Sequence, residues 1–175
     1  MKVKNPQAVK YFIGALFSDK DRLENAKQVW VNRIGEIDME SKSFPFDVTD
    51  YYEAEMGTPI FRQFFSFASL MSPGKLADLK LICNDIEEQF AVDNHRKVNL
   101  DIGYLDFHKM VLASAKYNGH KVYLSEGVYA DVTLVFERGE FHSLEHTFPD
   151  FKSGQYDEVF MRFRNTYKSQ LKVMQ

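Results

Sequence analysis

One short stretch of the sequence combines carboxylates, hydroxyls and aromatic rings at high density. It runs from Phe44 to Gly57 and contains four carboxylates and two adjacent tyrosines. Such residues suit a polar ligand or Mg²⁺, because carboxylate oxygens are hard ligands and tyrosines supply flat walls. A plainer interpretation is a turn, with Asp47 and Asp50 as turn or cap residues and the tyrosines half-buried. The candidate ligand-binding residues of this stretch are Asp47, Thr49, Tyr51, Tyr52 and Glu55.

Two later segments alternate between apolar and polar residues, as strands with one face on a core do. The first covers residues 98–103, and the second covers residues 128–137, whose even-numbered residues Val128 to Phe136 are expected to share one face. If both strands belong to one sheet, their polar positions form a floor beneath the Phe44–Gly57 connection. The floor is expected to contain Asn99, Asp101, Tyr129, Asp131 and Thr133, and Tyr104 completes the set of ligand-binding candidates.

This floor permits three interpretations. The first is an Mg²⁺ site with Asp47, Asp101 and Asp131 as oxygen ligands. The second is acid–base chemistry, because two close carboxylates raise the pKa of one of them. The third is a solvated sheet face, which antiparallel sheets commonly have. Side-chain types and spacing leave all three open.

A literal H-x-x-E-H pattern occurs at His142 to His146. In inverted zinc peptidases, a helix places both histidines of this pattern on one face and the glutamate activates water. Here the segment lies between a turn at Gly139 and Pro149, which leaves little room for a helix. Exposed loop histidines are therefore expected.

The segment Tyr11 to Leu16 resembles the first ribonucleoprotein signature of RNA-recognition motifs. The second signature would fall at Arg62 to Phe67, where Gln63 replaces the required glycine. These phenylalanines are therefore expected in the core. Arg164, Lys168 and Lys172 form a basic stripe at helical spacing, which also fits a solvated helix face.

Composition weighs against several classes of protein, although it does not exclude nucleic-acid binding. The net charge of −3 argues against nucleic-acid binding, which usually requires a basic excess. The single cysteine, Cys83, allows no intramolecular disulfide and fits a reducing, cytoplasmic location. No phosphate-cradling glycine loop occurs, and no apolar run reaches the roughly 18 residues of a membrane span.

The first half of the chain predicts strand–helix–strand–strand–helix–strand. Val9–Phe17 reads as a central strand, and a helix follows with Ser18 as its cap and Gly35 at its end. The remaining elements are expected at Glu36–Phe46 (strand), Pro59–Leu70 (strand), Ser72–Phe90 (helix) and Lys97–Tyr104 (strand). This order is that of a ferredoxin-like split βαβ core.

The second half is expected to extend this core. A short helix is predicted from Asp106 to Asn118, followed by a hairpin with strands Lys121–Leu124 and Val128–Glu137. An amphipathic helix is expected from Tyr156 to Leu171. The prediction is thus a single α+β domain over residues 1–175, with an antiparallel or mixed sheet.

Several specific segments resemble a known family over nearly the whole chain. They include Phe44-Pro45-Phe46-Asp47, Val98-Asn99-Leu100-Asp101 and Gly127-Val128-Tyr129-Ala130. The chain resembles an uncharacterised bacterial domain-of-unknown-function family, DUF4416, some of whose members are labelled GTP-binding. The resemblance includes the floor positions but implies no chemistry for them.

The leading hypothesis is a cleft, acidic and rich in tyrosine, that binds a small polar or phosphorylated ligand or a nucleotide, with Mg²⁺ as the cofactor considered. One alternative is an RNA-binding or protein-interaction module. The other is a metal-dependent hydrolase or transferase, so whether the protein is an enzyme stays open.

Overall fold

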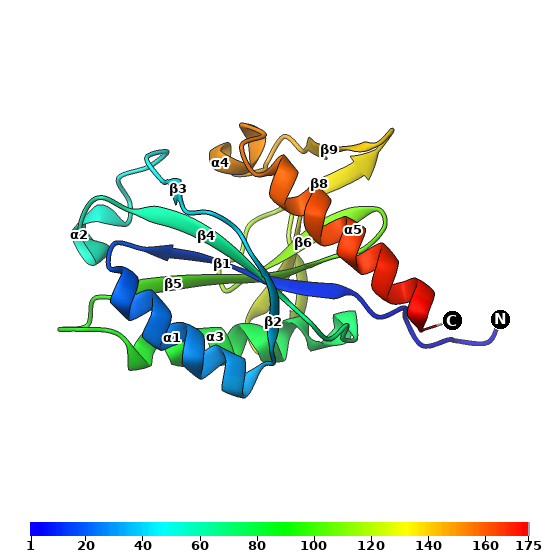
Figure 1. The fold of residues 1–175 in the computed structure, drawn as a ribbon, viewed down its shortest axis with the longest axis horizontal. Coiled ribbons are helices and arrows are strands. Elements are labelled where there is room, and N and C mark those ends of the chain that lie inside the picture. Colours follow the sequence, from blue (N-terminus) through cyan, green and yellow to red (C-terminus); the bar gives the residue numbers. More distant parts are fainter. Residues whose placement is uncertain (175) are drawn as a thin grey trace.

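The structure, a computed structural model, describes residues 1–174 of the chain and confirms the α+β class (Figure 1). Within these residues the strands are β1 (Lys10–Phe17), β2 (Ile37–Glu40), β3 (Phe44–Pro45), β4 (Phe61–Phe67), β5 (Val98–Leu105), β6 (Lys109–Ser114), β7 (Val122–Ser125), β8 (Val128–Glu137) and β9 (Glu140–Ser143). The helices are α1 (Lys20–Arg33), α2 (Glu53–Met56), α3 (Leu76–Gln89), α4 (Pro149–Lys152) and α5 (Asp157–Val173), with a 3₁₀ turn at Pro73–Lys75.

All described strands belong to one sheet, and every strand pair is antiparallel. The order is β2-β4-β1-β5-β6-β8-β7, with β3 beside β4 and β9 beside β8. The strands β2, β4, β1 and β5 therefore stand in the order expected for a ferredoxin-like core. That finer assignment stays a prediction.

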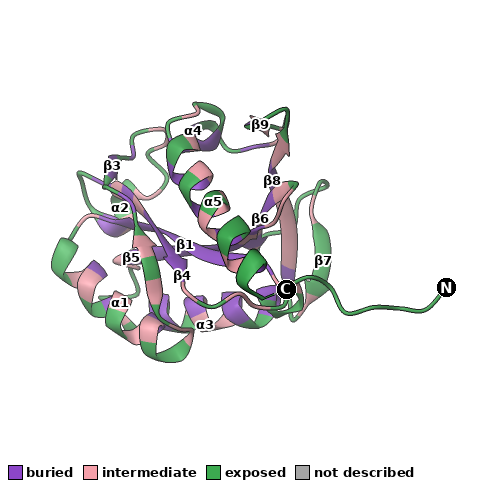
Figure 2. Cartoon of the chain, turned by 45° about the vertical axis from the view of Figure 1, so that its right-hand side comes forward, coloured by how far each residue is buried: buried purple, intermediate pink, exposed green. Residues whose placement is uncertain are grey.

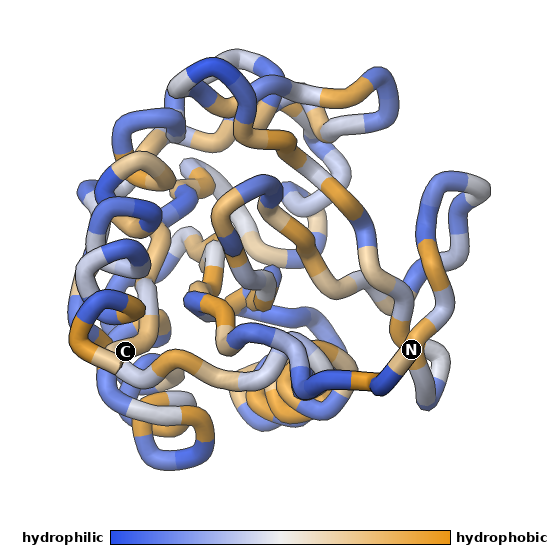
Figure 3. Tube along the Cα trace, turned by 90° about the vertical axis from the view of Figure 1, so that its right-hand side faces the viewer, coloured by the Kyte–Doolittle hydropathy of each residue, from blue (hydrophilic) through white to orange (hydrophobic). Residues whose placement is uncertain are grey.

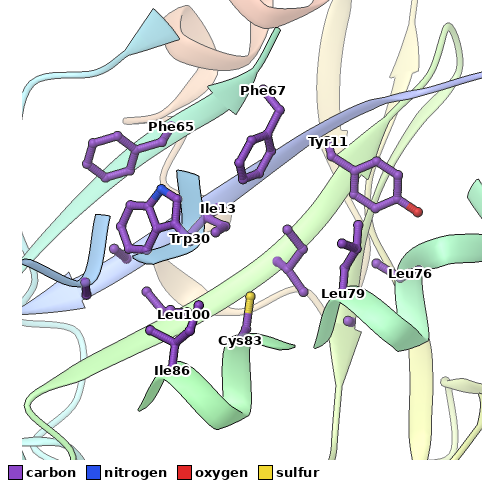
Figure 4. Close-up of a cluster of buried hydrophobic side chains, with 14 of the residues drawn as sticks. Tyr11, Ile13, Trp30, Phe65, Phe67, Leu76, Leu79, Cys83, Ile86 and Leu100 are labelled. Atoms are coloured by element: carbon purple, nitrogen blue, oxygen red, sulfur yellow. The ribbon is translucent and has the colours of Figure 1, made fainter. Parts of the chain in front are cut away.

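Helices cover both faces of the sheet (Figure 1). Alternation along β1 explains the division, because Ile13 faces a first core with α1 and α3 whereas Phe12 faces a second core with α5. In the first core, Trp30 of α1 and Cys83 of α3 lie among the sheet's apolar side chains (Figure 4). In the second, apolar residues recur along α5, and the tube view shows them alternating with hydrophilic ones (Figure 3).

The cap of α1 differs from the predicted one. Asp19, not Ser18, accepts hydrogen bonds from the N–H groups of Asp21 and Arg22. The Ser18 hydroxyl instead donates to the carbonyl of Met56, which ties the start of α1 to the Phe44–Gly57 connection.

The predicted helix at Asp106–Asn118 is wrong, because this segment contains strand β6. Met110 packs in the second core whereas Val111 and Ala113 pack in the first, so its side chains alternate across the sheet. Asp106 accepts hydrogen bonds from the N–H groups of His108 and Lys109, which closes a tight turn rather than capping a helix.

Two predicted strands are interrupted or bent. Glu36–Phe46 is divided into β2 and β3 because Ser41 leaves the regular ladder, its hydroxyl accepting the N–H of Phe64. In β8, Val132 and Leu134 pair with the successive residues Val111 and Met110, so Thr133 is the extra residue of a bulge.

Because of this bulge, the prediction that β8 has a single apolar face is wrong. Val128, Ala130 and Val132 contact the first core, whereas Leu134 and Phe136 contact the second. The strand therefore contributes to both sides of the sheet.

The sheet also splits in its middle. Strand β5 pairs with β1 along its whole length but with β6 only at Gly103, Tyr104 and Leu105. On the open side, Leu100 donates its N–H to Glu87 and accepts a hydrogen bond from Lys80, both on α3. These two side chains replace the missing strand partner, and the split positions the candidate site.

Candidate functional site

A cleft of about 230 Å³ opens where β5 and β6 diverge, and an adjoining recess of about 190 Å³ shares part of its lining. We call the larger space the β5–β6 cleft. Its charged lining consists of Asp101, Asp131, Arg62, Lys116 and Lys121. Tyr52, Ser114, Phe148 and Phe151 also line it.

The structure brings part of the predicted site together. Tyr52, Asp101 and Asp131 line the same cleft, although they come from three distant parts of the sequence. Asn99 lines the adjoining recess and donates a hydrogen bond to Asp101 at 3.1 Å. The predicted convergence of the connection with two strand faces thus has a counterpart in the fold.

The Phe44–Gly57 connection reaches the cleft because part of it is anchored by packing. Phe46 and Met56 are buried in a small cluster with Leu16 of β1. Helix α2 follows directly after Tyr52, which leaves this tyrosine half-buried at the cleft. The interpretation of this connection as a packed turn therefore explains its buried residues, whereas Tyr52 lines the cleft.

Other predicted residues lie elsewhere. Asp47 is exposed, and the Thr49 hydroxyl accepts the N–H of Tyr51 in a local turn. Tyr104 packs against Tyr11 on the opposite side of the sheet, because it lies an odd number of residues from Asp101. Neither Asp47 nor Tyr104 lines the β5–β6 cleft.

Two further candidates, both on β8, lie beside the cleft. Tyr129 contacts the rings of Tyr117 and Tyr123. Thr133 is buried and lines a smaller recess that shares Asp131 with the cleft.

Sequence reasoning missed the basic half of the site. In the sequence, Arg62 falls in the segment that fails to match an RNA-binding signature, and Lys116 falls inside the wrongly predicted helix. Lys121 is expected only to begin a strand of the hairpin. Strand alternation could have indicated Arg62, because it faces away from the first-core residues of β4.

Arg62 is almost fully buried at the base of the cleft. Its Nη1 donates to Asp101 Oδ2 at 3.2 Å, and its Nε lies 3.2 Å from Asp150 Oδ2. The guanidinium also lies over the rings of Phe46 and Phe151. Burial opposes its charge, but Asp101 and Asp150 outweigh burial and raise its pKa.

Asp150 completes this buried group. Its side chain is fully buried, and it accepts hydrogen bonds from the Tyr156 hydroxyl and the N–H of Phe151. Burial raises the pKa of its carboxyl, and the charge of Arg62 opposes that effect. The base of the cleft is thus a cluster of Arg62, Asp101 and Asp150, in which hydrogen bonds from Tyr156 and Phe151 hold Asp150 in place.

The other end of the cleft contains Lys121 and Asp131. Lys121 Nζ donates to Ser114 Oγ at 2.8 Å and lies 3.8 Å from Asp131 Oδ2. His146 Nε2 lies 3.3 Å from Asp131 Oδ1 but forms its hydrogen bond with the carbonyl of Val132. Asp131 Oδ1 is therefore buried without a hydrogen-bond partner among residues 1–174.

Lys116 lines the cleft, and its side chain contacts Tyr51, the neighbour of the cleft residue Tyr52. Lys116 Nζ donates to the Tyr51 hydroxyl at 3.0 Å and lies 4.5 Å from the ring centre. The hydrogen bond from Lys116 is the main cause of the lowered pKa of Tyr51. Both side chains are exposed, so this contact can open without a large cost.

Glu55 joins the α2 segment to the start of β5. It accepts two hydrogen bonds from the Arg96 side chain, at 2.7 and 2.8 Å, and one from the Arg96 N–H. These bonds are the main cause of the lowered pKa of Glu55. Arg96 also donates to Asn99, which connects this pair to the recess.

Because the pKa of Glu55 is lowered in the folded state, the pair stabilises the fold above the unfolded value of 4.5. Glu55→Gln is expected to lose about 1–2 kcal/mol of unfolding free energy at pH 7. That deficit should shrink as the pH falls from 4.5 through the folded pKa. Urea unfolding at several pH values measures it, with the exposed Glu53→Gln of the same helix as the control. A deficit that does not change with pH would contradict the ion pair.

The cleft does not gather a set of metal ligands. Among residues 1–174, no three His, Cys, Asp or Glu side chains lie close enough to hold a metal ion. The predicted trio of Asp47, Asp101 and Asp131 is not assembled, since Asp47 does not line the cleft. Asp101 and Asp131 each have a basic partner instead, so the cleft is of mixed charge rather than acidic.

The H-x-x-E-H segment forms no helix. His142 lies in β9, and His146 lies in the following loop, where its ring stacks on His120 at 4.5 Å. The geometry of the inverted zinc peptidases is therefore absent from residues 142–146.

The fold and cleft define the class, an α+β protein with one open antiparallel sheet that is split beside a charged cleft. The chain matches the family described as Domain of unknown function (DUF4416) over residues 7–167, and it belongs to that family. No curated protein and no solved structure matches it significantly. No helix in residues 1–174 has both the length and the apolar character that crossing a bilayer requires.

Proposed function

We propose that the β5–β6 cleft binds a small anionic ligand, most suitably one that carries a phosphate. The observation that supports this is the convergence of Arg62, Lys116 and Lys121 on one cleft, beside the Ser114 hydroxyl. Phosphate oxygens accept hydrogen bonds from ammonium, guanidinium and hydroxyl groups. Asp101 and Asp150 already pair with Arg62, so Lys116 and Lys121 are the basic residues that would supply most of the charge to the ligand.

The carboxylates give the ligand a second type of partner. Asp131 lines the cleft with its side chain 22% exposed, so it can accept a hydrogen bond from a hydroxyl or amine of the ligand. Mg²⁺ would bind only together with the phosphate of the ligand, with Asp131 as its protein ligand. Mg²⁺ often binds in this way, through one carboxylate and the phosphates of a substrate. Tyr52 would form a wall of the site.

Thermal-shift and calorimetric titrations test the proposal. The probes are inorganic phosphate, pyrophosphate, glucose 6-phosphate and GTP, each with and without Mg²⁺. At least one is expected to raise the melting temperature, because binding to the folded state alone stabilises it. Lys121→Met should weaken the binding of that probe about tenfold or more, since a charge-assisted hydrogen bond is lost.

Two further variants complete the experiment. Asp101→Asn should change the affinity as well, because it alters the partner of Arg62. Lys168→Met, an exposed lysine on α5, is the matched control and should bind like the wild type. An equal loss in Lys168→Met and Lys121→Met would indicate general charge attraction and would contradict a specific site.

The alternative of an RNA-binding module gains less support. Phe12 and Phe64 are fully buried, so they offer no platform on which bases could stack. In the basic stripe, Arg164 lies over the ring of Phe136 and donates to the carbonyl of Phe107. A hydrolase or transferase would require the same cleft together with turnover, and a cytoplasmic location stays a prediction.

A further inference from the structure

The recess of about 190 Å³ beside the β5–β6 cleft has a polar lining of its own, and we call it the α3 recess. The two spaces share the lining residues Tyr52, Asp101, Ala113, Ser114 and Lys116. A ligand bound in the cleft can therefore extend into the α3 recess. Beyond the shared wall, the recess is lined by Lys80, Asn84, Glu87, Arg96, Asn99 and Ala115.

Helix α3 supplies one side of this recess. Lys80, Asn84 and Glu87 are four and three residues apart, so they share one face of the helix. Lys80 and Glu87 are buried and Asn84 is half-buried, and Figure 2 shows buried, intermediate and exposed residues following one another along α3. Polar side chains are seldom buried in this way for packing alone, because their desolvation is costly.

The charged side chains of the α3 recess are paired within the protein. Lys80 Nζ donates to the carbonyl of Leu100 at 3.0 Å and lies 3.7 Å from Glu87 Oε1. Arg96 pairs with Glu55 at 2.7 Å and with Glu87 at 3.2 Å. The recess therefore offers a second anionic group less free charge than the cleft does.

Amide and carboxylate groups remain for an uncharged polar partner. The amide of Asn84 can both donate and accept hydrogen bonds. Asn99 Nδ2 donates to Asp101 Oδ1 and has a second N–H group. Asp101 is 27% exposed, and each of its oxygens has a further lone pair. Hydroxyl groups match this lining, because they donate and accept as well, and Tyr52 adds a flat apolar surface.

We propose that the α3 recess binds the hydroxyl-bearing part of the ligand, so that the protein recognises a monosaccharide phosphate. The phosphate would lie in the cleft at Lys116, Lys121 and the Ser114 hydroxyl. This inference rests on the proposed function, because it requires the anion in the cleft. The volumes of about 230 and 190 Å³ are each below the roughly 300 Å³ at which sites for drug-sized ligands begin. Such spaces suit a monosaccharide better than a nucleotide.

Calorimetric titration of the whole chain tests the class of ligand. The probes are inorganic phosphate, glycerol 3-phosphate, ribose 5-phosphate, glucose 6-phosphate and adenosine monophosphate. At least one of the two sugar phosphates is expected to bind about tenfold or more tighter than inorganic phosphate, with glycerol 3-phosphate between them, because added hydroxyls form further hydrogen bonds. Adenosine monophosphate, which adds a base to ribose 5-phosphate, should bind no tighter than the better sugar phosphate.

The outcomes separate this inference from the proposed function. Equal affinities for inorganic phosphate and both sugar phosphates, or tighter binding of adenosine monophosphate, would overturn the inference and leave the anion site in place. If none of the probes binds, the proposed function fails and the inference fails with it.

A variant of α3 tests where the sugar lies. Asn84→Ala should weaken the better sugar phosphate about three- to tenfold and leave inorganic phosphate unchanged, since Asn84 lines the recess and not the cleft. Unchanged binding of inorganic phosphate also shows that the variant is folded. Gln89→Ala removes an exposed amide from the same helix and should bind both probes like the wild type. An equal loss in Gln89→Ala, or no loss in Asn84→Ala, would contradict the assignment of the recess.

Discussion

Arg62→Ala is expected to lower the free energy of unfolding by about 3–5 kcal/mol, the range seen when one partner of a buried ion pair is removed. The reason is the fully buried Asp150, whose charge would lose the guanidinium that offsets its desolvation. Asp101 and the rings of Phe46 and Phe151 would lose a contact as well. Urea unfolding at pH 7 measures the loss.

Two variants separate charge from packing at this position. Arg62→Lys keeps the charge but has no planar fork, so an intermediate loss is expected. Lys116→Ala removes a basic residue from the exposed mouth of the same cleft and should cost less than about 1 kcal/mol. Similar losses in Arg62→Ala and Lys116→Ala would show that the buried ion cluster does not hold the base of the cleft.

Gly103→Ala is expected to destabilise the fold by about 1–3 kcal/mol, and Gly103→Val by more. A Cβ at residue 103 would lie 2.5 Å from the carbonyl oxygen of Val111 and 2.7 Å from Leu112 Cδ2. Backbone cannot yield as a flexible side chain does, so β5 and β6 would have to separate. Gly103 lies where their pairing ends, and the substitution should therefore also disturb ligand binding in the cleft.

Gly119→Ala is the matched control, because a Cβ there meets nothing within 4 Å. Its unfolding free energy should stay within about 0.5 kcal/mol of the wild type. If Gly103→Ala unfolds at the same urea concentration as Gly119→Ala, the close approach of β5 and β6 at this point is contradicted.

Local periodicity explains which elements could be predicted. The stripes of α1, α3 and α5 and the alternation of β5 are fixed by residues a few positions apart, and each was predicted in nearly its observed place. Asp101 and Tyr52 could be predicted to lie in one site. Strand alternation assigns Asp101 to the polar face of the sheet, and Tyr52 belongs to the short connection expected above that face.

The strand β6 could not be recognised in this way. Both of its faces are covered, since Met110 packs in one core and Val111 in the other. A short run that is apolar on both faces carries no period that separates strand from helix. Because this strand was predicted as a helix, Lys116, which lies just after it and lines the cleft, could not be predicted as a site residue.

The bulge in β8 and the charge of the cleft depend on contacts between distant segments. Thr133 is the extra residue only because β6 pairs with β8 as it does. Each carboxylate of the cleft meets a basic residue at least ten positions away in the sequence, such as Arg62 with Asp101. The sequence pattern predicted an acidic cleft, because it could not include those partners.

An NMR titration of the ¹⁵N-labelled protein with pyrophosphate tests the binding of an anion in the β5–β6 cleft most directly. The amide signals of Ser114, Lys116 and Lys121 are expected to shift together and to saturate, while those of α5 around Lys168 stay in place. Lys121→Met should abolish saturation at the same concentrations. Shifts that spread over all basic surfaces without saturating, or no shifts up to about 10 mM, would contradict the site.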